Sequence, residues 1–348
     1  MEEVERELGH TAIKLASNEN PLGPSPKAKE AIRKALESIY LYPDGGGYYL
    51  RERLAEYHGL EMDQIILGAG STDLIELVGK TFLTPGDEAI TSESAFYIYR
   101  LAIEEMGATP VMVPMHAMKY DFAAIGRAIS PRTKVIYLGN PNNPTGTMFT
   151  ASELDHFLNG LPKRILVVLD EAYYEYVLRP DYSHSLDYVR AGRNVLVLRT
   201  FSKVYGLAGL RIGYGMAHTE LVESLNRIRS PFNASYLAQA AALAALDDTE
   251  HLARSVESNR RGMKFLTEEL TLAGVRYTPS VGNFILIDTG RDCEEDFARL
   301  LHEGVIVRPV KLYGLPTSLR VTVGTQEENE QFLEALRRVS AEPARVAS

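Results

Sequence analysis

A lysine flanked by hydroxyl residues is the feature of this chain with the clearest chemical potential. Lys203 follows Thr200 and Ser202, and Arg211 lies eight residues further on. A lysine amine can form a Schiff base with an aldehyde, while hydroxyl and guanidinium groups can bind a phosphate. Pyridoxal phosphate carries both groups. The spacing therefore favours a pyridoxal-phosphate site, provided that other segments supply the remaining contacts.

A carboxylate directly follows an apolar run. Asp170 comes after Ile165–Leu169, and Tyr173 lies three residues beyond it. The carboxyl end of a buried parallel strand is where open α/β sheets bind ligands. Asp170 could pair with a pyridinium nitrogen and keep it protonated, and Tyr173 could reach the phenolic oxygen of the same ring. The alternative is that Asp170 caps a helix.

Two further turns contain candidate ligand-binding groups. In Gly68–Asp73, the free amides of Ser71 and Thr72 would face an anion at the positive end of a helix. This turn fits a dinucleotide site or an ordinary strand-to-helix connection equally well, although a nicotinamide fingerprint requires a third glycine where Asp73 stands. The proline-rich loop Asn140–Gly146 could hold the Asn143 amide in one place, but a structural turn would look similar.

Composition restricts the class of protein. The 348 residues favour two domains, with 45% hydrophobic and 24% charged residues as in ordinary globular proteins. The net charge of −9 argues against nucleic acid as the main partner. The single Cys293 excludes an intramolecular disulfide framework and indicates a reducing compartment. The eight histidines show no ligand spacing, so no metal site is expected.

The chain shows no targeting or membrane-spanning signal. Met1–Leu8 is dominated by glutamate and lacks a basic region followed by an apolar stretch. No window approaches the roughly 20 apolar residues that span a bilayer. We therefore expect a cytoplasmic protein without a membrane partner.

The middle of the chain alternates short apolar runs with amphipathic segments. The candidate strands are Gln64–Leu67, Glu88–Thr91, Thr109–Val113, Lys134–Leu138, Ile165–Leu169, Asn194–Leu198 and Arg211–Gly215. The candidate helices between them include Ser71–Phe82, Tyr97–Met106, Phe122–Ile129 and Ala151–Leu158. This alternation predicts an α/β fold with a mostly parallel seven-stranded sheet covered by helices on both faces.

The C-terminal third predicts a smaller α+β domain. Three long helical stretches, Glu220–Arg229, Tyr236–Leu246 and Glu250–Leu272, follow the last strand of the sheet. After them come strands at Asn283–Ile287, Val305–Arg308 and Leu319–Val323 and helices near Glu294–Glu303 and Gln326–Val339. We expect a large domain over residues 40–248 and a small domain formed by residues 1–39 and 249–348.

These segments together resemble one enzyme family. The motifs that carry the resemblance are Asn18–Pro21, Tyr42–Asp44, Gly70–Ser71, Asn142–Gly146, Asp170–Tyr173, Thr200–Arg211 and Leu319–Gly324. In this order they are similar to the fold-type I pyridoxal-phosphate aminotransferases, and most closely to the histidinol-phosphate aminotransferases. The resemblance runs from about Leu15 to Val339. It is highly specific for the superfamily and less so for the substrate.

The resemblance implies a role for each matching residue. Lys203 becomes the Schiff-base lysine, Asp170 the partner of the ring nitrogen, and Phe96 the aromatic residue that stacks on the ring. Asn143 and Tyr173 become the ligands of the phenolic oxygen. The implied phosphate ligands are Ser71, Thr72, Thr200, Ser202 and Arg211.

The resemblance also implies a homodimer, in which Tyr42 reaches the phosphate of the neighbouring subunit. Arg320 matches the arginine that grips the anionic end of the substrate, and Arg308 a second basic contact. Asn20 is a candidate for lining the substrate pocket, and so are three tyrosines: Tyr97, Tyr99 and Tyr313.

The implied reaction transfers the amino group of histidinol phosphate to 2-oxoglutarate. Two arginines predict an anionic substrate without choosing among anions, so an aromatic amino-acid aminotransferase remains an alternative. A decarboxylase of phosphorylated amino acids and a non-catalytic cofactor-binding module are further alternatives. The chain departs from the family pattern at Ala69, Ser94-Ala95 and Val204, which bears on substrate preference more than on reaction type.

Overall fold

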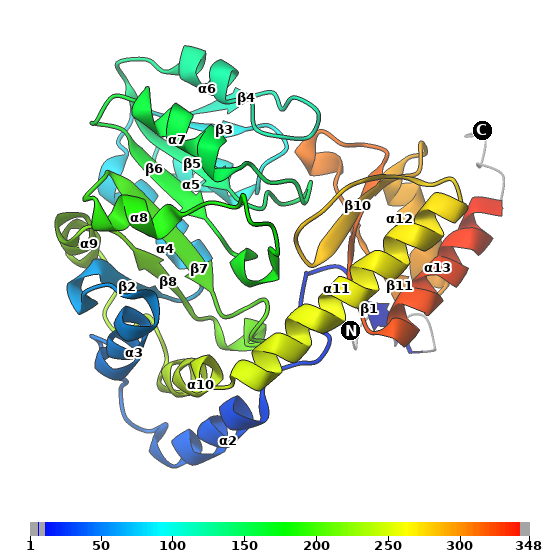
Figure 1. Ribbon diagram of the computed structural model, residues 1–348, viewed down its shortest axis with the longest axis horizontal. Coiled ribbons are helices and arrows are strands. Elements are labelled where there is room, and N and C mark those ends of the chain that lie inside the picture. The colour runs from blue at the N-terminus through cyan, green and yellow to red at the C-terminus, as the bar shows by residue number, and fades with distance from the viewer. Residues whose placement is uncertain (1–5, 7–10, 342–348) are drawn as a thin grey trace.

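The computed structural model describes residue 6 and residues 11–341, so most of the segment Met1–Leu8 lies outside the described residues. The strands are β1 (Ile13–Lys14), β2 (Ile65–Gly68), β3 (Glu88–Ser92), β4 (Thr109–Val113), β5 (Thr133–Gly139), β6 (Leu166–Asp170), β7 (Val195–Thr200), β8 (Gly213–Met216), β9 (Arg276–Thr278), β10 (Phe284–Asp288), β11 (Val305–Ile306), β12 (Arg308–Pro309) and β13 (Ser318–Thr322). The α-helices are α2 (Pro26–Ala35), α3 (Tyr48–His58), α4 (Ser71–Phe82), α5 (Ile98–Glu105), α6 (Phe122–Ala128), α7 (Ala151–Asn159), α8 (Ser185–Arg190), α9 (Thr219–Asn226), α10 (Tyr236–Leu246), α11 (Thr249–Leu272), α12 (Cys293–His302) and α13 (Gln326–Ala341) (Figure 1).

A seven-stranded sheet forms the larger part of the molecule. Its strand order is β2-β8-β7-β6-β5-β3-β4. The strands from β7 to β4 are paired in parallel, whereas β8 runs antiparallel to both of its neighbours. The predicted α/β fold with a mostly parallel seven-stranded sheet is therefore confirmed.

Alternate residues of the same strands enter two separate cores. In β6, Val167 and Leu169 join one apolar cluster, while Leu166 and Val168 join the other. The first cluster includes residues of α2, α3, α6, α7, α8 and α10, and the second includes residues of α4, α5 and α9. Helices therefore cover both faces of the sheet, which explains why strands such as β6 are apolar throughout.

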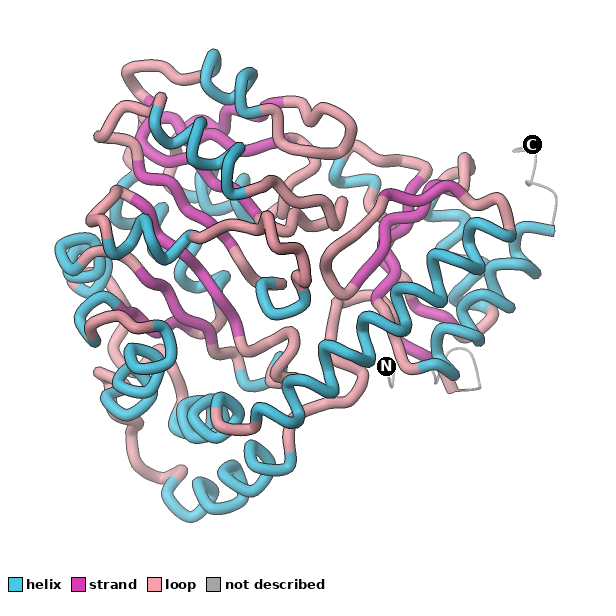
Figure 2. The backbone as a smooth tube through the Cα atoms, viewed as in Figure 1, coloured by secondary structure: helices cyan, strands magenta, loops and turns pink. Residues whose placement is uncertain are grey.

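A second, smaller assembly stands beside the large sheet (Figure 2). It contains a four-stranded sheet of order β12-β13-β10-β9 and the two-stranded pair β1-β11. A third apolar cluster joins Leu15 of the N-terminal arm to residues between Leu266 and Val339. The long helix α11 runs from the large body, near α10, to this smaller assembly (Figure 1).

The helix α2 packs on the large-sheet body. Ala28 belongs to the first core cluster, and Ile32 packs against it, so this helix lies on the large-sheet body. Ser25 caps the helix by accepting a hydrogen bond from the amide of Ala28, and Pro26 is its first residue. Residues 26–35 therefore pack with the large sheet, whereas the prediction placed residues 1–39 in the small domain.

Most predicted strands begin and end within one or two residues of the observed ones, and for two of them the difference has a structural cause. The strand expected at Arg211–Gly215 begins only at Gly213, because Arg211 adopts a left-handed backbone conformation with φ 56°. The strand expected at Val305–Arg308 is divided into β11, which pairs with the N-terminal arm, and β12, which pairs with β13.

In the described part of the chain, no helix combines the length and apolar character needed to cross a membrane.

Candidate active site

A cavity of about 450 Å³ lies between the two assemblies. We call its two sides the large-sheet wall and the small-sheet wall; Ser17 and Asn18 of the N-terminal arm also line it. The large-sheet wall consists of Ser71, Thr72, Phe96, Tyr97, Tyr99, Pro141, Asn143, Asp170, Ala172, Tyr173, Thr200, Ser202, Lys203 and Arg211. The small-sheet wall consists of Glu294, Arg308, Pro309, Lys311, Leu312, Tyr313 and Arg320.

The N-terminus of α4 forms one end of the large-sheet wall. Ser71 and Thr72 begin this 12-residue helix, so their amides lie at its positive end. Two glycines allow other segments to approach this turn closely. A Cβ atom at Gly70 would lie 2.5 Å from a guanidinium nitrogen of Arg211, and one at Gly213 would lie 2.6 Å from the Ser71 amide. The sequence therefore forms a compact cradle with hydroxyl, amide and guanidinium donors.

The carboxyl end of β7 supplies the other donors of this cradle. Thr200 is the last residue of the strand, and its Oγ1 accepts a hydrogen bond from the Ser202 amide at 3.1 Å. Arg211 Nη1 donates to Ser202 Oγ at 3.3 Å. Because β8 pairs antiparallel with β7 and Gly213 lies opposite Thr200, Arg211, near the end of the connecting loop, lies beside the end of β7.

Asp170 is a buried carboxylate at the end of β6. Its Oδ2 accepts a hydrogen bond from the Tyr99 hydroxyl at 2.8 Å, and its Oδ1 a longer one from the Ala172 amide at 3.3 Å. Burial raises the pKa of Asp170 to about 6, while the hydrogen bond from Tyr99 acts in the opposite direction. Both donors are neutral, so a cation in the cavity would stabilise the ionised carboxylate.

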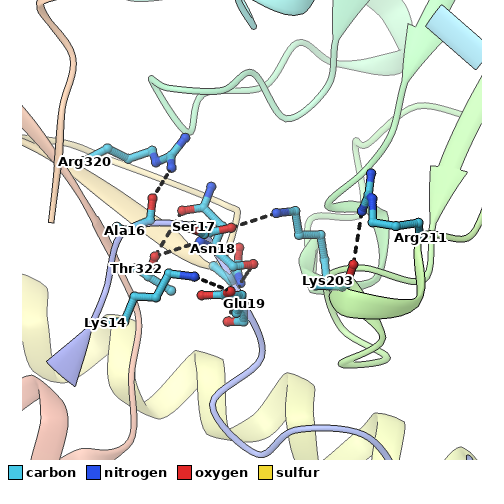
Figure 3. A network of polar contacts seen from close by, with 11 residues as sticks. Lys14, Ala16, Ser17, Asn18, Glu19, Lys203, Arg211, Arg320 and Thr322 are labelled. Carbon is cyan, nitrogen blue, oxygen red and sulfur yellow. Dashed lines mark hydrogen bonds and ion pairs between the residues drawn. The ribbon is translucent and has the colours of Figure 1, made fainter. Parts of the chain in front are cut away.

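Lys203 approaches the cavity from the loop after β7. Its Nζ donates a hydrogen bond to the Ser17 carbonyl at 2.9 Å (Figure 3). Burial lowers the pKa of Lys203 to about 7, and the positive charges of Arg320 and Arg211 act in the same direction. Near neutral pH, a large fraction of this amine is therefore unprotonated and nucleophilic.

Asn143 and Tyr173 are held by residues from distant parts of the chain. Asn143 Oδ1 accepts a hydrogen bond from Arg320 Nη1 at 2.6 Å, an arrangement that leaves the amide nitrogen as its donor. The Tyr173 hydroxyl accepts one from Asn18 Nδ2 at 2.9 Å. Burial raises the pKa of Tyr173 to about 12, so its hydroxyl remains a donor at neutral pH.

Two arginines lie opposite each other on the small-sheet wall. Arg308 of β12 pairs in register with Arg320 of β13. Arg320 is buried, with Nη2 donating to the Ala16 carbonyl at 2.5 Å, and its Nε has no hydrogen-bond partner among the residues that the structure describes. Like charges directly across an antiparallel pair repel each other. An anion in the cavity would relieve this repulsion and supply the partner that Arg320 Nε lacks.

Of three further predicted site residues, one lines the cavity and two do not. Phe96 lines it, in edge-to-face contact with Tyr99. Tyr42 lies away from it, 83% exposed and stacked on Phe232. Asn20, predicted to line the pocket, is not among the described residues of the cavity wall.

The Asn20 side chain instead ties the N-terminal arm to the body of the protein. Its Nδ2 donates to the Val204 carbonyl and to Ser255 Oγ, and its Oδ1 accepts from the Leu22 amide. Asn18 takes the position on the cavity wall. Both asparagines belong to the same sequence motif, and only the fold distinguishes which of them reaches the cavity.

Sequence reasoning did not find several other groups of the cavity wall. Asn18 contacts Tyr173, which lies 155 positions away in the chain, and Thr322, which lies 304 positions away. Lys311 and Glu294 form part of a salt-bridge group on the small-sheet wall, with Lys311 Nζ 3.0 Å from Asp292. No local pattern could have identified these contacts, because they depend on tertiary packing. The part of the chain that the structure describes contains no group of three or more metal-ligating side chains.

The cavity suits pyridoxal phosphate. The cradle at Gly70, which a Cβ atom would fill, offers hydroxyl, amide and guanidinium donors to a phosphate. Within the described part of the chain, the buried Asp170 carboxylate has no cationic hydrogen-bond partner, which a protonated pyridine nitrogen would provide. Lys203 lines the same cavity with an amine that could react with an aldehyde.

Comparison with known proteins gives a consistent result. A histidinol-phosphate aminotransferase of Moorella thermoacetica is 49% identical over 98% of this chain and 89% of its own length. Histidinol-phosphate aminotransferase 2 of Pseudomonas fluorescens strain Pf-5 is 50% identical over 98% of this chain and 93% of its own length.

Among solved structures, that of histidinol-phosphate aminotransferase from Sinorhizobium meliloti, in complex with pyridoxal-5'-phosphate, matches with a TM-score of 0.89 and 29% identity. The match covers 97% of this chain and 94% of the other. A single mutant of Thermus thermophilus aspartate aminotransferase matches with a TM-score of 0.85 and 28% identity over 96% of this chain and 93% of the other. Residues 10–336 match the family described as aminotransferase class I and II, and the chain therefore belongs to that family.

Proposed function

We propose that this aminotransferase uses pyridoxal phosphate to transfer the amino group of histidinol phosphate to 2-oxoglutarate. The relatives that bear the name histidinol-phosphate aminotransferase support this proposal, at about half identity over nearly the whole chain. The observation that carries it in the structure is the cross-strand pair of Arg308 and Arg320 on the cavity wall. Two guanidinium groups suit a substrate that carries a phosphate dianion.

The proposed cofactor contacts follow the large-sheet wall. The phosphate would be held by the cradle of Ser71, Thr72, Thr200, Ser202 and Arg211. Asp170 would bind the protonated ring nitrogen, and Phe96 would stack on the ring face. When bound, pyridoxal phosphate supplies an aldehyde that captures amines and a ring that accepts electrons from the substrate carbon.

Lys203 would hold the cofactor and move the proton of the reaction. With a pKa of about 7, its amine can give up the proton that covalent attachment requires and later accept one from the substrate carbon. The Asn143 amide and the Tyr173 hydroxyl would donate hydrogen bonds to the phenolic oxygen. Both donors are oriented by neighbours: Arg320 binds Asn143, and Asn18 binds Tyr173.

A comparison of amine substrates tests the proposed function. We expect a much larger kcat/KM for histidinol phosphate than for phenylalanine, with 2-oxoglutarate as the acceptor. A preference for phenylalanine would instead favour an aromatic amino-acid aminotransferase. Release of carbon dioxide from a phosphorylated amino acid, without formation of glutamate, would favour a decarboxylase. Absence of all turnover by the cofactor-loaded protein would favour a binding module.

We further propose that the chain forms a homodimer in which Tyr42 completes the site of the partner. Exposed large apolar side chains gather in two stretches, residues 36–57 and residues 228–236, and Tyr42 stacks on Phe232 within this surface. An exposed apolar surface of this kind favours association with another protein surface. Sedimentation should give a mass of about twice 38.7 kDa.

Mixed dimers test the role of Tyr42. A dimer of one Tyr42→Phe chain and one Lys203→Ala chain contains one fully intact site only if Tyr42 acts across the interface. We expect such mixtures to regain the activity of about one site in four, because half of the randomly formed dimers are mixed and each has one intact site. Activity no higher than the sum of the two parent variants would contradict the shared site.

We also propose a revised division into domains. The large domain would comprise residues 26–248, and the small domain would comprise residues 249–348 together with the arm that precedes residue 26. The packing of α2 against the large-sheet core supports the first boundary, and the cluster that joins Leu15 to α11 and α13 supports the second. Residues 1–5, 7–10 and 342–348 lie outside the described residues.

A further inference from the structure

Tyr99 connects the carboxylate of Asp170 to the aromatic side of the cavity. It lies in the first turn of α5, three residues after Phe96, and only 1% of its surface is exposed. Its hydroxyl donates a 2.8 Å hydrogen bond to Asp170 Oδ2. The helix that follows the ring-stacking position thus also supplies a donor to the group proposed to bind the ring nitrogen.

The ring of Tyr99 is fixed by its neighbours. It stacks on Tyr137 of β5, with ring centroids 5.4 Å apart and an interplanar angle of 10°. It meets Phe96 edge to face, with centroids 5.7 Å apart. Gly139 leaves room for the hydroxyl, because a Cβ atom at that position would lie 3.1 Å from it. The position of the hydroxyl is therefore determined by the strand below it and by the aromatic residue beside it.

The hydrogen bond assigns different tasks to the two oxygens of Asp170. Tyr99 remains protonated, because burial raises its pKa far above the ordinary value, and it therefore acts as donor to the carboxylate. It occupies Oδ2 at 2.8 Å, whereas the bond from the Ala172 amide to Oδ1 is long at 3.3 Å. Oδ1 consequently keeps acceptor capacity for a donor in the cavity.

We propose that Tyr99 is a positioning residue, which fixes the Asp170 carboxylate so that Oδ1 is presented to the protonated ring nitrogen of the cofactor. The inference rests on the proposed function, since it assumes that pyridoxal phosphate binds in this cavity. A hydrogen bond to an ionised carboxylate also favours its ionised form. Tyr99 therefore favours the charge state that pairs with a pyridinium group.

Several other ionisable groups act on Asp170. Lys203, from the loop after β7, favours its ionised form, and Glu171, next to it in the chain, opposes it. Tyr120 and Tyr173 lie close enough for the Asp170 charge to raise their pKa values. Among these groups and Tyr99, only Tyr99 donates a side-chain hydrogen bond to the carboxylate within the described residues.

Tyr99→Phe removes one oxygen atom and tests the proposal. The matched control is Tyr137→Phe, which removes the hydroxyl of the ring stacked on Tyr99; that hydroxyl donates to the Ile75 carbonyl at 3.4 Å and not to Asp170. The first measurement is the dissociation constant of pyridoxal phosphate for the apoprotein, by fluorescence quenching. We expect Tyr99→Phe to weaken binding about tenfold or more, and Tyr137→Phe to weaken it less than twofold.

The second measurement is the pH dependence of cofactor binding. Without the Tyr99 hydroxyl, the apoprotein protonates Asp170 at a higher pH than the wild-type value of about 6. The pH at which affinity falls on the acid side should therefore move upward in Tyr99→Phe and remain unchanged in Tyr137→Phe. A loss of packing alone would weaken binding equally at every pH.

A double-mutant cycle completes the test. With Asp170→Asn already present, Tyr99→Phe should change the dissociation constant less than twofold. The inference is overturned if Tyr99→Phe behaves like Tyr137→Phe, or if its effect persists at full size beside Asp170→Asn. If the wild-type protein does not bind pyridoxal phosphate, the proposed function fails first, so the two failures are distinguishable.

Discussion

The two walls of the cavity hold their charged groups in different ways. On the large-sheet wall, burial raises the pKa of Asp170 to about 6 and lowers that of Lys203 to about 7. On the small-sheet wall, Arg308 is exposed, Lys311 is paired with carboxylates at the surface, and the buried Arg320 keeps its charge because a guanidinium group does not lose its proton near neutral pH. Proton transfer requires groups whose pKa values lie near the working pH, and burial provides such values. Recognition of an anion requires only permanent charges in the right places.

The difference also reflects the supporting elements. Asp170 and Thr200 end neighbouring strands of a sheet that is packed on both faces, so their backbones are fixed by two cores. Arg308 belongs to a two-residue strand at the edge of the four-stranded sheet. We therefore expect substitutions on the large-sheet wall to abolish the reaction, and substitutions on the small-sheet wall to change which substrate is used.

The largest expected effect follows from Lys203→Ala. Without an amine to hold the cofactor and move the proton, kcat should fall about 10⁴-fold or more, while circular dichroism remains that of the folded protein. In the wild type loaded with the cofactor, borohydride reduction should leave the cofactor covalently attached to Lys203, which peptide mass analysis would detect. Turnover within tenfold of wild type would contradict the proposed role. Lys311→Ala is the matched control, since that lysine lies on the other wall.

Arg320→Lys comes second. Arg320 is buried and lies beside Asn143, so a lysine would lose the planar fork and disturb the asparagine as well. We expect a loss of about 2–5 kcal/mol in kcat/KM for histidinol phosphate. A loss in kcat/KM below tenfold would mean that another group binds the anion.

Stability against pH tests the buried carboxylate directly. The folded-state pKa of Asp170 is raised from 3.8 to about 6, so the folded apoprotein keeps this proton while the unfolded chain has lost it. The contribution of Asp170 to stability is therefore fully present below about pH 4 and is lost as pH rises to about 6, by about 3 kcal/mol. Urea denaturation at several pH values should show that the free energy of unfolding of the wild type falls relative to that of Asp170→Asn between about pH 4 and pH 6. A difference in unfolding free energy that stays constant with pH would contradict the raised pKa.

Lys203 should show the opposite sign in a different window. Its folded-state pKa is lowered from 10.5 to about 7, so the unfolded chain binds the proton more tightly between these values. This group therefore destabilises the folded apoprotein near pH 7, and the penalty disappears as pH rises towards 10.5. Lys203→Met should remove that rise in stability. If the free energy of unfolding of the variant rises with pH as steeply as that of the wild type, groups other than Lys203 cause the rise.

The smallest effect is expected for Arg308→Gln. This side chain is exposed, and solvent screens its interaction with an anion. We expect kcat/KM for histidinol phosphate to fall about tenfold or less, with little change for phenylalanine, which has no phosphate. An equal loss for both substrates would mean that Arg308 contacts a group common to them.

The sequence predicted the large-sheet wall well because local patterns encode it. Apolar runs identify the strands, so the sequence alone places Asp170 and Ser71 at strand and helix ends. A predicted strand bound was wrong at Arg211. Its left-handed backbone conformation is not that of a strand, so β8 begins only at Gly213. The sequence could not show that Asn18, rather than Asn20, lies on the cavity wall, because most of their side-chain partners lie 155 to 304 positions away and no local pattern indicates such contacts.

The N-terminal arm passes between the groups that ligands would need. The Ser17 carbonyl accepts a hydrogen bond from Lys203, and the neighbouring Ala16 carbonyl accepts one from Arg320 (Figure 3). A cofactor that takes Lys203 must compete with the Ser17 carbonyl for the same amine, whereas an anion can bind Arg320 Nε while Nη2 keeps its hydrogen bond to Ala16. Binding of the cofactor therefore changes the hydrogen bonding of the peptide unit next to the one that Arg320 holds.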